Sequence, residues 1–526
     1  MAVESMSRLQ SMLRRAFNEH HARPALWVAG RLYTYAEIWD TAQAIAAKLL
    51  DRLGAEETVG VLAQRSLSAY VGILGAVLAG RGYVPLNMKV PVGRQASMVA
   101  TARCGAFISD AKSDTRRREL SAALGREDFE IVEHAIREKD RAKGADVAAG
   151  DDGRIAYVMF TSGTTGAPKG VAVTRDNLRT YLDAVACVAE FEPGARCSQL
   201  FDLSFDLSVH DIFRTWTGGG CLYIMTDEET IDPAGFARRH ELECWFSVPS
   251  VVAMAKRLNR LGAGSLPSLR LSLFCGEALP TSIAKQWVQV APNSRIFNLY
   301  GPTEATIAIT ACLFRPEACE GLATVPLGEA FAGSAAVVLG ESGDLVPLGN
   351  SGELWLGGAQ IAPGYINNAS ENSQRFVRRR IEGFPFDRWY RTGDIARADP
   401  AHGLIFQGRR DHQVKINGYR VELLEIEEAL RIAAECADVA AAPWPISPDG
   451  AAEGIVAFIC ESSRSQADIL AGCRTRLPSY MVPQRVVTVQ TIPINANGKV
   501  DRAALIERHL RRTAKEPAAQ STVNVN

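Results

Sequence analysis

The sequence predicts an α/β protein. In it a large N-terminal domain, with two helix-covered and mainly parallel sheets plus a small β unit, precedes a smaller α+β C-terminal domain. A chain of 526 residues is too long to form one hydrophobic core. Apolar runs alternate with helical stretches over about the first three hundred residues, as is typical of parallel strands covered on both faces. After about residue 324 the runs shorten and Gly/Pro-rich turns separate them.

Composition and charge bear on which classes of binding partner the protein has. The formal net charge is −1, with 47% hydrophobic and 22% charged residues, so we expect neither nucleic acid nor a membrane as a partner. The N-terminus has no signal pattern. The longest apolar run, 69–80, is too short to span a bilayer and favours a buried helix. The 11 cysteines form no C-x-x-C pair, as is typical of reduced thiols in a cytoplasmic protein.

The apolar runs of the N-terminal domain, taken in order, define its parallel strands. They lie at 58–63, 82–86, 106–109, 155–160, 244–248, 269–274 and 295–300. In parallel sheets the loops at the carboxyl ends of the strands form the binding site. Two further runs, 336–339 and 353–356, indicate the small antiparallel β unit, and the domain is expected to cover residues 1–407.

A second domain is expected at 412–510, after a break at 408–411. Its length of about a hundred residues is within the usual domain range. Its elements, in order, are a hairpin-like stretch at 413–422, a helix at 424–434, a strand at 455–459, a helix at 469–477 and a strand at 486–489. The remaining residues, 511–526, are small and polar, and we expect them to be disordered.

The loop after the strand at 155–160 carries the strongest functional signal. It reads Thr161-Ser-Gly-Thr-Thr-Gly166, and Lys169 follows shortly after. Glycine permits the backbone angles with which N–H groups and hydroxyls close around phosphate oxygens. The spacing is not that of a Walker A loop, because Lys169 precedes glycine instead of Ser or Thr. A mobile Ser/Gly linker is the alternative, but a linker does not usually follow directly after an apolar strand.

A second motif, Asn-Leu-Tyr-Gly-Pro-Thr-Glu at 298–304, ends the last predicted parallel strand. Beside Gly-Pro, the Tyr300 ring can lie flat on a base. Thr303 and Glu304 offer oxygen donors suited to phosphate and Mg²⁺. Taken alone the motif also fits an ordinary tight turn, and its pairing with the phosphate loop favours the binding interpretation.

Three further positions follow in order along the chain. Asp394, after a glycine turn, can accept both hydroxyls of a ribose, and Arg409, after Gly408, can reach a phosphate. Lys499 lies on a turn beside Gly498. A lone surface lysine is the usual interpretation of such a position. The alternative that we favour is a mobile loop that delivers one positive charge.

In this order the motifs resemble the adenylate-forming enzymes, the ANL superfamily of acyl-CoA synthetases, luciferases and nonribosomal-peptide adenylation domains. The resemblance is to amino-acid-activating adenylation enzymes in particular, and it extends from 33–37 and 78–86 through Lys499. It implies an N-terminal AMP-binding core, a hinge at Asp411 and a mobile C-terminal lid that carries the catalytic Lys499. The chain departs from the common pattern at Asn417, where most relatives carry arginine, and this bears on the pantetheine contacts.

The resemblance also implies ATP and Mg²⁺ as cofactors, with Glu304 as the metal residue. Tyr300 is implied to stack on adenine, Asp394 to hold the ribose, and Lys499 to contact the substrate carboxylate and the α-phosphate. The full set of implied ATP-binding residues is Thr161, Ser162, Gly163, Thr164, Thr165, Gly166, Lys169, Gly276, Glu277, Asn298, Leu299, Tyr300, Gly301, Pro302, Thr303, Asp394, Phe406, Gly408, Arg409 and Lys499.

The substrate end is interpreted through a doublet, Phe-Asp-Leu-Ser-Phe-Asp-Leu-Ser at 201–208. We choose the second copy, because the family continues with S-V-x-[DE]-x-F after it. Asp206 is then implied to face the ammonium group of the substrate, and Asp202 to be structural. A buried carboxylate needs such a partner, since without one its burial costs several kcal/mol. Acyl-CoA synthetases for fatty or aryl acids have no reason to keep an acid there.

The other implied pocket positions indicate a small substrate side chain. With Asp206 and Lys499 they are Leu207, His210, Ser247, Leu273, Cys275, Leu299, Ile307 and Ala308. The segment 273–280 looks most like the D-alanine–D-alanyl carrier protein ligases, and Cys275 matches the cysteine that this family places beside the substrate methyl. The alternative is that Cys275 is a small core residue. His210 replaces an apolar residue of that family, so small L-amino acids stay among the alternative substrates.

The resemblance therefore implies an AMP-forming amino acid–carrier protein ligase. We expect it to activate alanine, with a preference for D-alanine, as aminoacyl-AMP. It would then transfer the aminoacyl group to the phosphopantetheine thiol of a separate carrier protein, because no carrier motif follows Lys499. Three alternatives stay open. They are an adenylation enzyme for L-alanine, glycine, serine or proline in a secondary-metabolite pathway, a CoA ligase for a small organic acid, and a non-catalytic carrier-binding relative.

Overall fold

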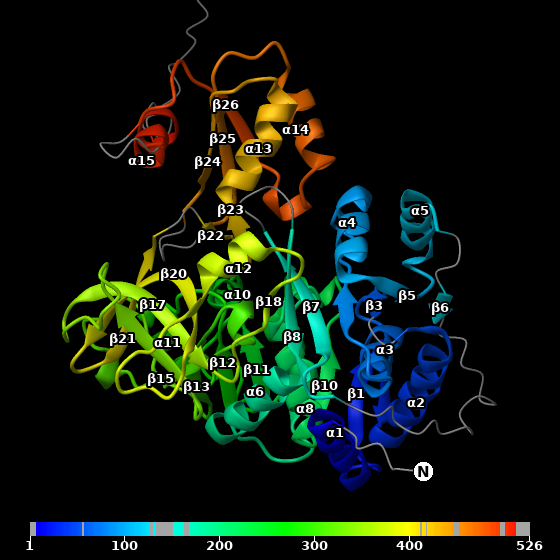
Figure 1. Ribbon diagram of the computed structural model, residues 1–526. Helices are drawn as coiled ribbons and strands as arrows, with labels where there is room; N and C mark the ends of the chain where they lie inside the picture. The colour runs from blue at the N-terminus through cyan, green and yellow to red at the C-terminus, as the bar shows by residue number, and fades with distance from the viewer. Residues whose placement is uncertain are drawn as a thin grey trace, which may run out of the picture. The chain divides into compact units, whose positions relative to one another are not determined.

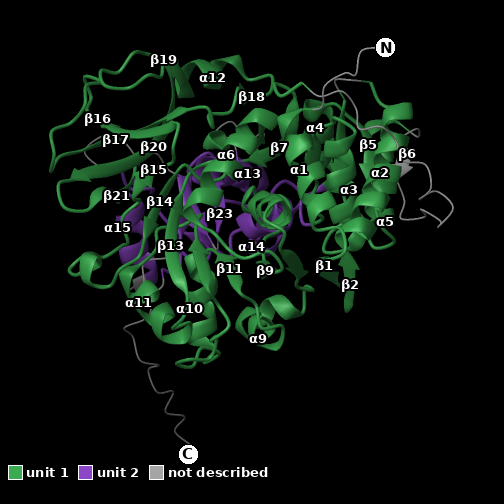
Figure 2. Ribbon diagram, turned by 90° about the horizontal axis from the view of Figure 1, so that it is seen from below, with its two compact units in different colours: residues 1–88, 92–161, 168–411 green, residues 89–91, 162–167, 412–526 purple. Residues whose placement is uncertain are grey.

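The computed structural model consists of two compact units (Figure 2). It describes residues 7–54, 57–126, 130–132, 151–162, 168–410, 413–416, 418–446, 452–494 and 500–511. Unit 1 comprises residues 1–88, 92–161 and 168–411, and unit 2 comprises residues 89–91, 162–167 and 412–526. The α/β fold class predicted from the sequence is confirmed, with the parallel sheets in unit 1.

The first sheet of unit 1 has seven strands in the order β18-β8-β7-β4-β3-β5-β6 (Figure 1). Their bounds are β3 Thr58–Val61, β4 Tyr83–Pro85, β5 Cys104–Ile108, β6 Glu130–Val132, β7 Ile155–Thr161, β8 Lys169–Thr174 and β18 Gly364–Tyr365. The strands from β7 to β6 are parallel, and β8 and β18 continue the sheet in antiparallel fashion. The fully buried strands β3, β4 and β8 explain why the sequence is apolar without alternation here.

The second sheet has nine strands in the order β15-β14-β13-β12-β11-β9-β10-β1-β2. Their bounds are β1 Pro24–Val28, β2 Arg31–Thr34, β9 Arg196–Gln199, β10 Cys221–Ile224, β11 Cys244–Ser247, β12 Leu271–Phe274, β13 Arg295–Tyr300, β14 Thr310–Leu313 and β15 Glu329–Ala330. The central strands from β1 to β13 are parallel, and antiparallel strands close both edges.

Helices cover these sheets. Their bounds are α1 Arg8–Glu19, α2 Tyr35–Arg52, α3 Leu67–Leu78, α4 Val92–Ala102, α5 Asp114–Leu124, α6 Arg175–Val188, α7 Leu207–Val209, α8 Thr215–Thr217, α9 Pro233–Arg239, α10 Pro249–Arg257, α11 Thr281–Val290 and α12 Ala369–Arg375. Short 3-10 helices span Glu229–Ile231, Thr303–Ala305 (η4) and Glu317–Cys319, and a π-helix, η2, spans His210–Arg214. Capping boxes at Ser7, Thr34 and Thr174 begin α1, α2 and α6. The buried helix expected at 69–80 corresponds to α3.

Two hydrophobic clusters lie on the two faces of the nine-stranded sheet. The first holds side chains from both sheets and from α1, α2, α3 and α6. The second holds side chains from α9, α10 and α11. Strand alternation separates the two clusters, because Phe246 belongs to the first and its neighbour Trp245 to the second.

An antiparallel five-stranded sheet completes unit 1. Its strands are β16 Ser334–Leu339, β17 Ser351–Gly358, β19 Phe376–Arg378, β20 Arg388–Asp399 and β21 Gly403–Arg409. The sequence predicted two strands of this unit and missed β19, β20 and β21. Arginine, aspartate and glycine interrupt β20, and glycine and glutamine limit the apolar run of β21 to three residues, so neither strand shows the longer apolar pattern by which a strand is recognised.

Unit 2 is an α+β unit with its own hydrophobic core. It contains the hairpin β22 Gln413–Ile416 and β23 Tyr419–Glu422, helix α13 Leu423–Ala434, strand β24 Val439–Pro443, strand β25 Ile455–Ile459, helix α14 Gln466–Arg474, a 3-10 helix Ser479–Met481, strand β26 Arg485–Thr488, helix α15 Arg502–Ile506 and a π-helix Glu507–Arg511. The expected hairpin, helices and strands are confirmed. Strand β24 was missed because three consecutive alanines do not signal a strand.

Two further observations concern the cysteines and the helices. All eleven cysteines are free thiols. No helix among the described residues combines the length and the apolarity that crossing a membrane requires.

Candidate nucleotide and amino-acid site

Glu304 is a buried carboxylate in the turn after β13. The strand ends at Tyr300, and Gly301 and Pro302 lead into η4, which contains Glu304. Glu304 is 1% exposed, and its Oε1 accepts a hydrogen bond of 2.7 Å from the hydroxyl of Tyr365. This contact fixes the orientation of the carboxylate that the sequence assigned to Mg²⁺.

Tyr300, Asp394 and Arg409 come together although they lie on different strands. The antiparallel register of β20 and β21 sets Asp394 opposite Arg409, and the two side chains form an ion pair. The Tyr300 hydroxyl donates to the other oxygen of Asp394, and the Arg409 guanidinium also donates to the Thr392 carbonyl over 3.0 Å. Burial, and then the charge of Asp394, raises the pKa of Tyr300, so its hydroxyl stays protonated. The positions assigned to base, ribose and phosphate therefore form one cluster.

Lys169 is held by an acidic partner on α12. It begins β8, opposite Thr161 at the end of β7. Its Nζ lies 2.8 Å from Glu371 Oε1, and the side chain is 7% exposed. The ammonium group also lies 5.7 Å from the centre of the Tyr365 ring. The loop residues between these strands, Gly163, Thr164, Thr165 and Gly166, lie outside the described residues.

Several other implied ATP contacts make hydrogen bonds within the protein. The carboxylate of Glu277 accepts from the Ser250 N–H over 3.0 Å and from its hydroxyl over 3.1 Å. The Asn298 amide donates to the Pro326 carbonyl over 2.8 Å. Phe406 packs against the same cluster of apolar side chains as Tyr300. Gly276 and Gly408 have φ angles of 87° and 125°, which favour glycine.

The two aspartates of the doublet have different surroundings. Asp202 accepts hydrogen bonds from the Ser204 N–H, the Ser204 hydroxyl and the Asn87 amide, at 2.9, 2.7 and 2.9 Å. These bonds support the structural role expected for Asp202. Asp206 directly precedes α7 and is 8% exposed. Burial, and then the charge of Asp206, raises the pKa of Tyr83. The Asp206 carboxylate therefore lies close enough to this buried tyrosine to influence its ionisation.

Six of the implied pocket side chains are buried in the same large hydrophobic cluster. Leu207, Leu273, Cys275, Leu299, Ile307 and Ala308 all belong to the first hydrophobic cluster and are at most 6% exposed. Ser247 differs, because its hydroxyl accepts a hydrogen bond of 2.8 Å from the indole of Trp245, which belongs to the second cluster. The structure therefore sets Ser247 apart from the other six, and strand alternation in the sequence could have indicated this.

His210 is a further polar residue among the implied pocket positions. It begins η2, and its Nδ1 lies 2.6 Å from the hydroxyl of Tyr181 on α6. Its ring centre is 4.6 Å from that of Phe246. Burial, together with the nearby charge of Arg214, lowers the pKa of His210 to about 3, so the imidazole is neutral. Sequence reasoning missed Tyr181, which lies 29 residues away with no motif around it.

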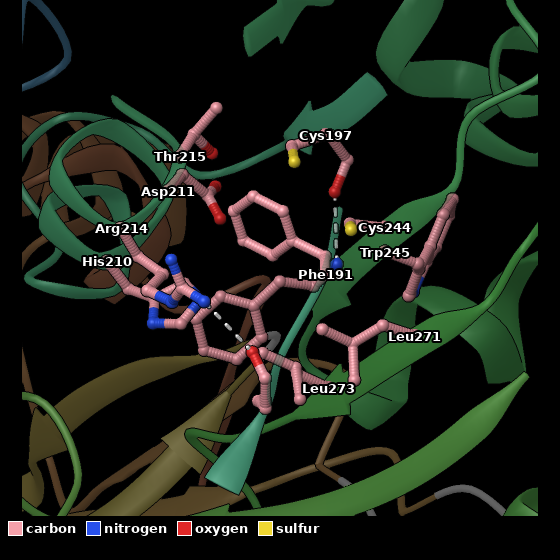
Figure 3. A pocket seen from close by; sticks show the side chains of 13 residues that line it. Phe191, Cys197, His210, Asp211, Arg214, Thr215, Cys244, Trp245, Leu271 and Leu273 are labelled. Atoms are coloured by element: carbon pink, nitrogen blue, oxygen red, sulfur yellow. Dashed lines mark hydrogen bonds between the residues drawn. The ribbon is translucent and has the colours of Figure 1, made fainter. Parts of the chain in front are cut away.

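A small cavity adjoins His210 and Leu273 (Figure 3). Its volume is about 20 Å³, enough for a buried water. Figure 3 shows Asp211 and Arg214 beside it, opposite Cys197 and Cys244 of the sheet. Asp211 and Arg214 are 3% and 7% exposed. Burial raises the pKa of Asp211 and lowers that of Arg214. The pocket wall at His210 is thus backed by two buried charged side chains, of which Asp211 belongs to the motif that follows the doublet and Arg214 lies just beyond it.

Three further sequence assignments concern residues that the structure does not describe. They are the catalytic Lys499, the hinge Asp411 and the departure at Asn417, all outside the described residues. Their assigned roles remain predictions.

Comparison with known proteins gives the following matches. Residues 13–366 match the family described as AMP-binding enzyme, and residues 425–499 match the AMP-binding enzyme C-terminal domain. The D-alanine–D-alanyl carrier protein ligase of Bacillus velezensis is 30% identical over 501 residues, which cover 91% of this chain and 94% of that protein.

Solved structures extend the comparison. The Vibrio cholerae adenylation domain AlmE, in complex with glycyl-adenosine-5'-phosphate, is 33% identical with a TM-score of 0.86, covering 97% of this chain and 99% of that one. PA1221, an NRPS protein containing adenylation and PCP domains, is 25% identical with a TM-score of 0.80, covering 96% of this chain and 85% of that one. Both matches therefore cover nearly the whole of this chain.

Proposed function

The chain belongs to the AMP-binding enzyme family, and on that premise we propose that it activates a small amino acid with ATP and passes the aminoacyl group to a separate carrier protein. It is an adenylate-forming enzyme related to D-alanyl carrier protein ligases and to nonribosomal-peptide adenylation domains. The observation that carries the finer proposal is the buried Asp206 carboxylate beside a group of tightly packed, mostly apolar side chains.

Asp206 supports an amino acid over a simple organic acid. Asp206 is 8% exposed, and a buried carboxylate pairs favourably with a positively charged group of a substrate. The ammonium group of an amino acid supplies this charge. A carboxylic acid without an amino group brings no such charge, which weakens the CoA-ligase alternative.

The packing around Leu273, Cys275 and Ile307 supports a small side chain. These residues are at most 2% exposed, so a large substrate side chain would have to displace them. Alanine in its D form is our first candidate, because the Bacillus velezensis relative is named for D-alanine. Glycine is the second, because AlmE is described in complex with glycyl-adenosine-5'-phosphate.

The donor set around Glu304 fits Mg²⁺. Glu304 and Thr303 offer hard oxygen ligands, and no group of three or more His, Cys, Asp and Glu side chains converges among the described residues. This suits an ion held by one carboxylate and by the phosphates of the substrate. When bound, Mg²⁺ neutralises phosphate charge and so assists the departure of pyrophosphate.

The residues then have the following proposed roles in adenylation. A carboxylate oxygen of the amino acid attacks the α-phosphorus, and the bond from that phosphorus to the bridging oxygen of pyrophosphate breaks. Tyr300 supports the adenine, Asp394 accepts hydrogen bonds from the ribose, and Arg409 holds Asp394 in place through their ion pair. Lys499 stabilises the negative charge that develops on the phosphate.

Transfer is the second proposed step. The thiol of the phosphopantetheine arm gives its proton to water and, as a thiolate, attacks the aminoacyl carbonyl carbon. A carbon–sulfur bond forms, the bond from that carbon to the phosphate oxygen of AMP breaks, and AMP leaves with the electron pair. Two names support a carrier protein as the acceptor: that of the D-alanyl carrier protein ligase and that of PA1221, which contains a PCP domain. We propose that the carrier is a separate chain.

Amino-acid-dependent exchange of pyrophosphate into ATP tests the proposal. The panel contains D-alanine, L-alanine, glycine, L-serine, L-proline, L-leucine, L-phenylalanine and propionate. We expect D-alanine to be activated best and the two bulky amino acids not at all. Asp206→Asn should reduce exchange by about a hundredfold or more, because it leaves the ammonium group buried without a counter-charge.

Asp202→Asn is the matched control. It lies in the other copy of the doublet, and its hydrogen bonds to Ser204 and Asn87 predict lower stability with an unchanged KM for the amino acid. Propionate activated as well as alanine would overturn the amino-acid assignment. A preference for phenylalanine would overturn the small pocket.

A further inference from the structure

A strained turn carries two of the implied pocket residues. Thr306 and Ile307 both have positive φ angles, 58° and 72°, and the Ala308 N–H donates to the Thr306 carbonyl over 2.9 Å. This hydrogen bond across one residue makes a γ-turn of the rare, positive-φ kind. β-Branched residues seldom adopt such angles, so the turn persists only where its surroundings hold it.

One side chain, Gln360, binds this turn. Gln360 is fully buried, and its Nε2 lies 2.7 Å from the Ala308 carbonyl oxygen, 3.3 Å from that of Ala305 and 3.4 Å from that of Thr306. In return, the Thr306 hydroxyl donates to the Gln360 carbonyl over 2.6 Å. The Ser334 hydroxyl donates to Gln360 Oε1 over 3.3 Å, which fixes the orientation of the amide. We refer to Gln360 and its three carbonyl partners as the Gln360 clamp.

The chain next to Gln360 is itself anchored. Arg388 donates to the Ala362 carbonyl over 2.7 Å, and the Ala362 N–H donates to the Glu304 carbonyl over 2.9 Å. The same short segment therefore holds both the strained turn and the residue assigned to Mg²⁺.

Gly301 makes a second close contact with the turn. A Cβ at this position would lie 2.6 Å from Ala308 Cα and 3.0 Å from the Ile307 carbonyl oxygen. The turn therefore has almost no room to shift toward Gly301. Without the hydrogen bonds from Gln360, the turn would be free to move away from Gly301.

We propose that Gln360 is a positioning residue for amino-acid selection, which acts by holding Ile307 and Ala308 where they limit the size of the substrate side chain. This inference rests on the proposed function, since it names what shapes the same pocket. Gln360 contacts neither reacting atom. It acts through the backbone of residues 305–308.

Gln360→Met tests the clamp, because methionine keeps the length of the side chain and removes both donors. Thr306→Val is the milder second variant, since it removes the hydroxyl that donates to Gln360 and keeps a β-branched shape. The matched control is Gln10→Met. Gln10 is also fully buried, and its amide donates to the Val77 and Leu78 carbonyls over 3.1 Å each at the end of α3.

We expect Gln360→Met to raise the KM for alanine about tenfold, because three buried carbonyls lose a donor and the turn relaxes. The ratio of kcat/KM for alanine to that for valine should fall, while the KM for ATP stays within about twofold. Thr306→Val should shift both quantities in the same direction by less. Gln10→Met should lower Tm and leave the ratio unchanged.

Hydrogen exchange provides a readout that does not need catalysis. We expect the amides of 305–309 to lose protection in Gln360→Met and to keep it in Gln10→Met. Unchanged protection, or an unchanged alanine-to-valine ratio, would overturn the proposal. If the wild type activates propionate instead of amino acids, the proposed function fails. The role of Gln360 is then decided by the ratio of kcat/KM for propionate to that for a longer acid.

Discussion

His210 is held as a neutral imidazole in the interior, and this makes stability depend on pH. Its pKa is lowered to about 3, and that of a histidine in an unfolded chain is about 6.5. Between these values the unfolded chain binds a proton that the folded protein excludes. Its contribution is therefore present above about pH 6.5 and is lost as the pH falls toward 3, by roughly 2 kcal/mol at about pH 5.

A glutamine in place of His210 checks this linkage. His210→Gln keeps a polar group near Tyr181 and removes the titration, so its Tm should fall less than that of the wild type between about pH 7 and about pH 5. His21→Gln is the control, because His21 is exposed. Parallel losses of Tm in the wild type and His210→Gln would show that His210 does not carry the dependence.

Residues that act through a sequence motif could be predicted, and residues that act through packing could not. Asp206 and not Asp202 was assigned to the substrate because family residues follow only the second copy of the doublet, and that assignment stays a prediction. Tyr181 and Gln360 lie in stretches without a motif. They reach His210 and the turn 305–308 only when helices and strands distant in sequence come together. No local pattern records such a contact.

At the scale of elements, the sequence predicted those whose burial dictates their composition. Strands β3, β4 and β11 are buried along their whole length, so their apolar runs are distinct. Strands β20 and β21 lie in an antiparallel sheet with polar side chains. The residues expected there, Asp394 and Arg409, were found from glycine-turn motifs and not from a strand pattern.

The register of β20 and β21 leads to a prediction for Arg409. Its guanidinium pairs with Asp394, and the two side chains are 13% and 9% exposed. Arg409→Ala should lower stability by about 2–4 kcal/mol and raise the KM for ATP about tenfold or more, because Asp394 then keeps a buried charge without its cation. Tm and pyrophosphate exchange at varied ATP concentrations measure the two effects.

Arg391→Ala is the matched control, because Arg391 lies on β20, the strand of Asp394, and also pairs with a carboxylate. Arg391 pairs with Glu353 over 2.8 Å but is 36% exposed, so its loss should cost less and should leave the KM for ATP within about twofold. An equal rise of that KM in both variants would remove the special role of Asp394 and Arg409 in nucleotide binding.

At the scale of the whole molecule, two units with separate hydrophobic cores suit the two half-reactions that we propose. Side chains of unit 2 form their own cluster, which includes residues of α13, β25 and α14. Each unit can therefore keep its internal packing while the C-terminal one moves, as the proposed swing about Asp411 requires. Length and the break expected at 408–411 predicted more than one unit. The delivery of Lys499 to the site that we propose would depend on both units together, and no single segment of sequence encodes it.

The two half-reactions give the sharpest test of Lys499. Lys499→Ala should slow adenylation about a hundredfold or more, because one positive charge is removed from the developing negative charge on the phosphate. Transfer from preformed aminoacyl-AMP to the carrier thiol should stay near the wild-type rate, since the lysine has left the site by then. Pyrophosphate exchange measures the first step, and thioester formation from synthetic aminoacyl-AMP measures the second. Lys285→Ala, an exposed lysine on α11, should affect neither step. If Lys499→Ala slowed both steps equally, the lysine would serve the fold or the binding of AMP, and the swing of the C-terminal unit would lose its main support.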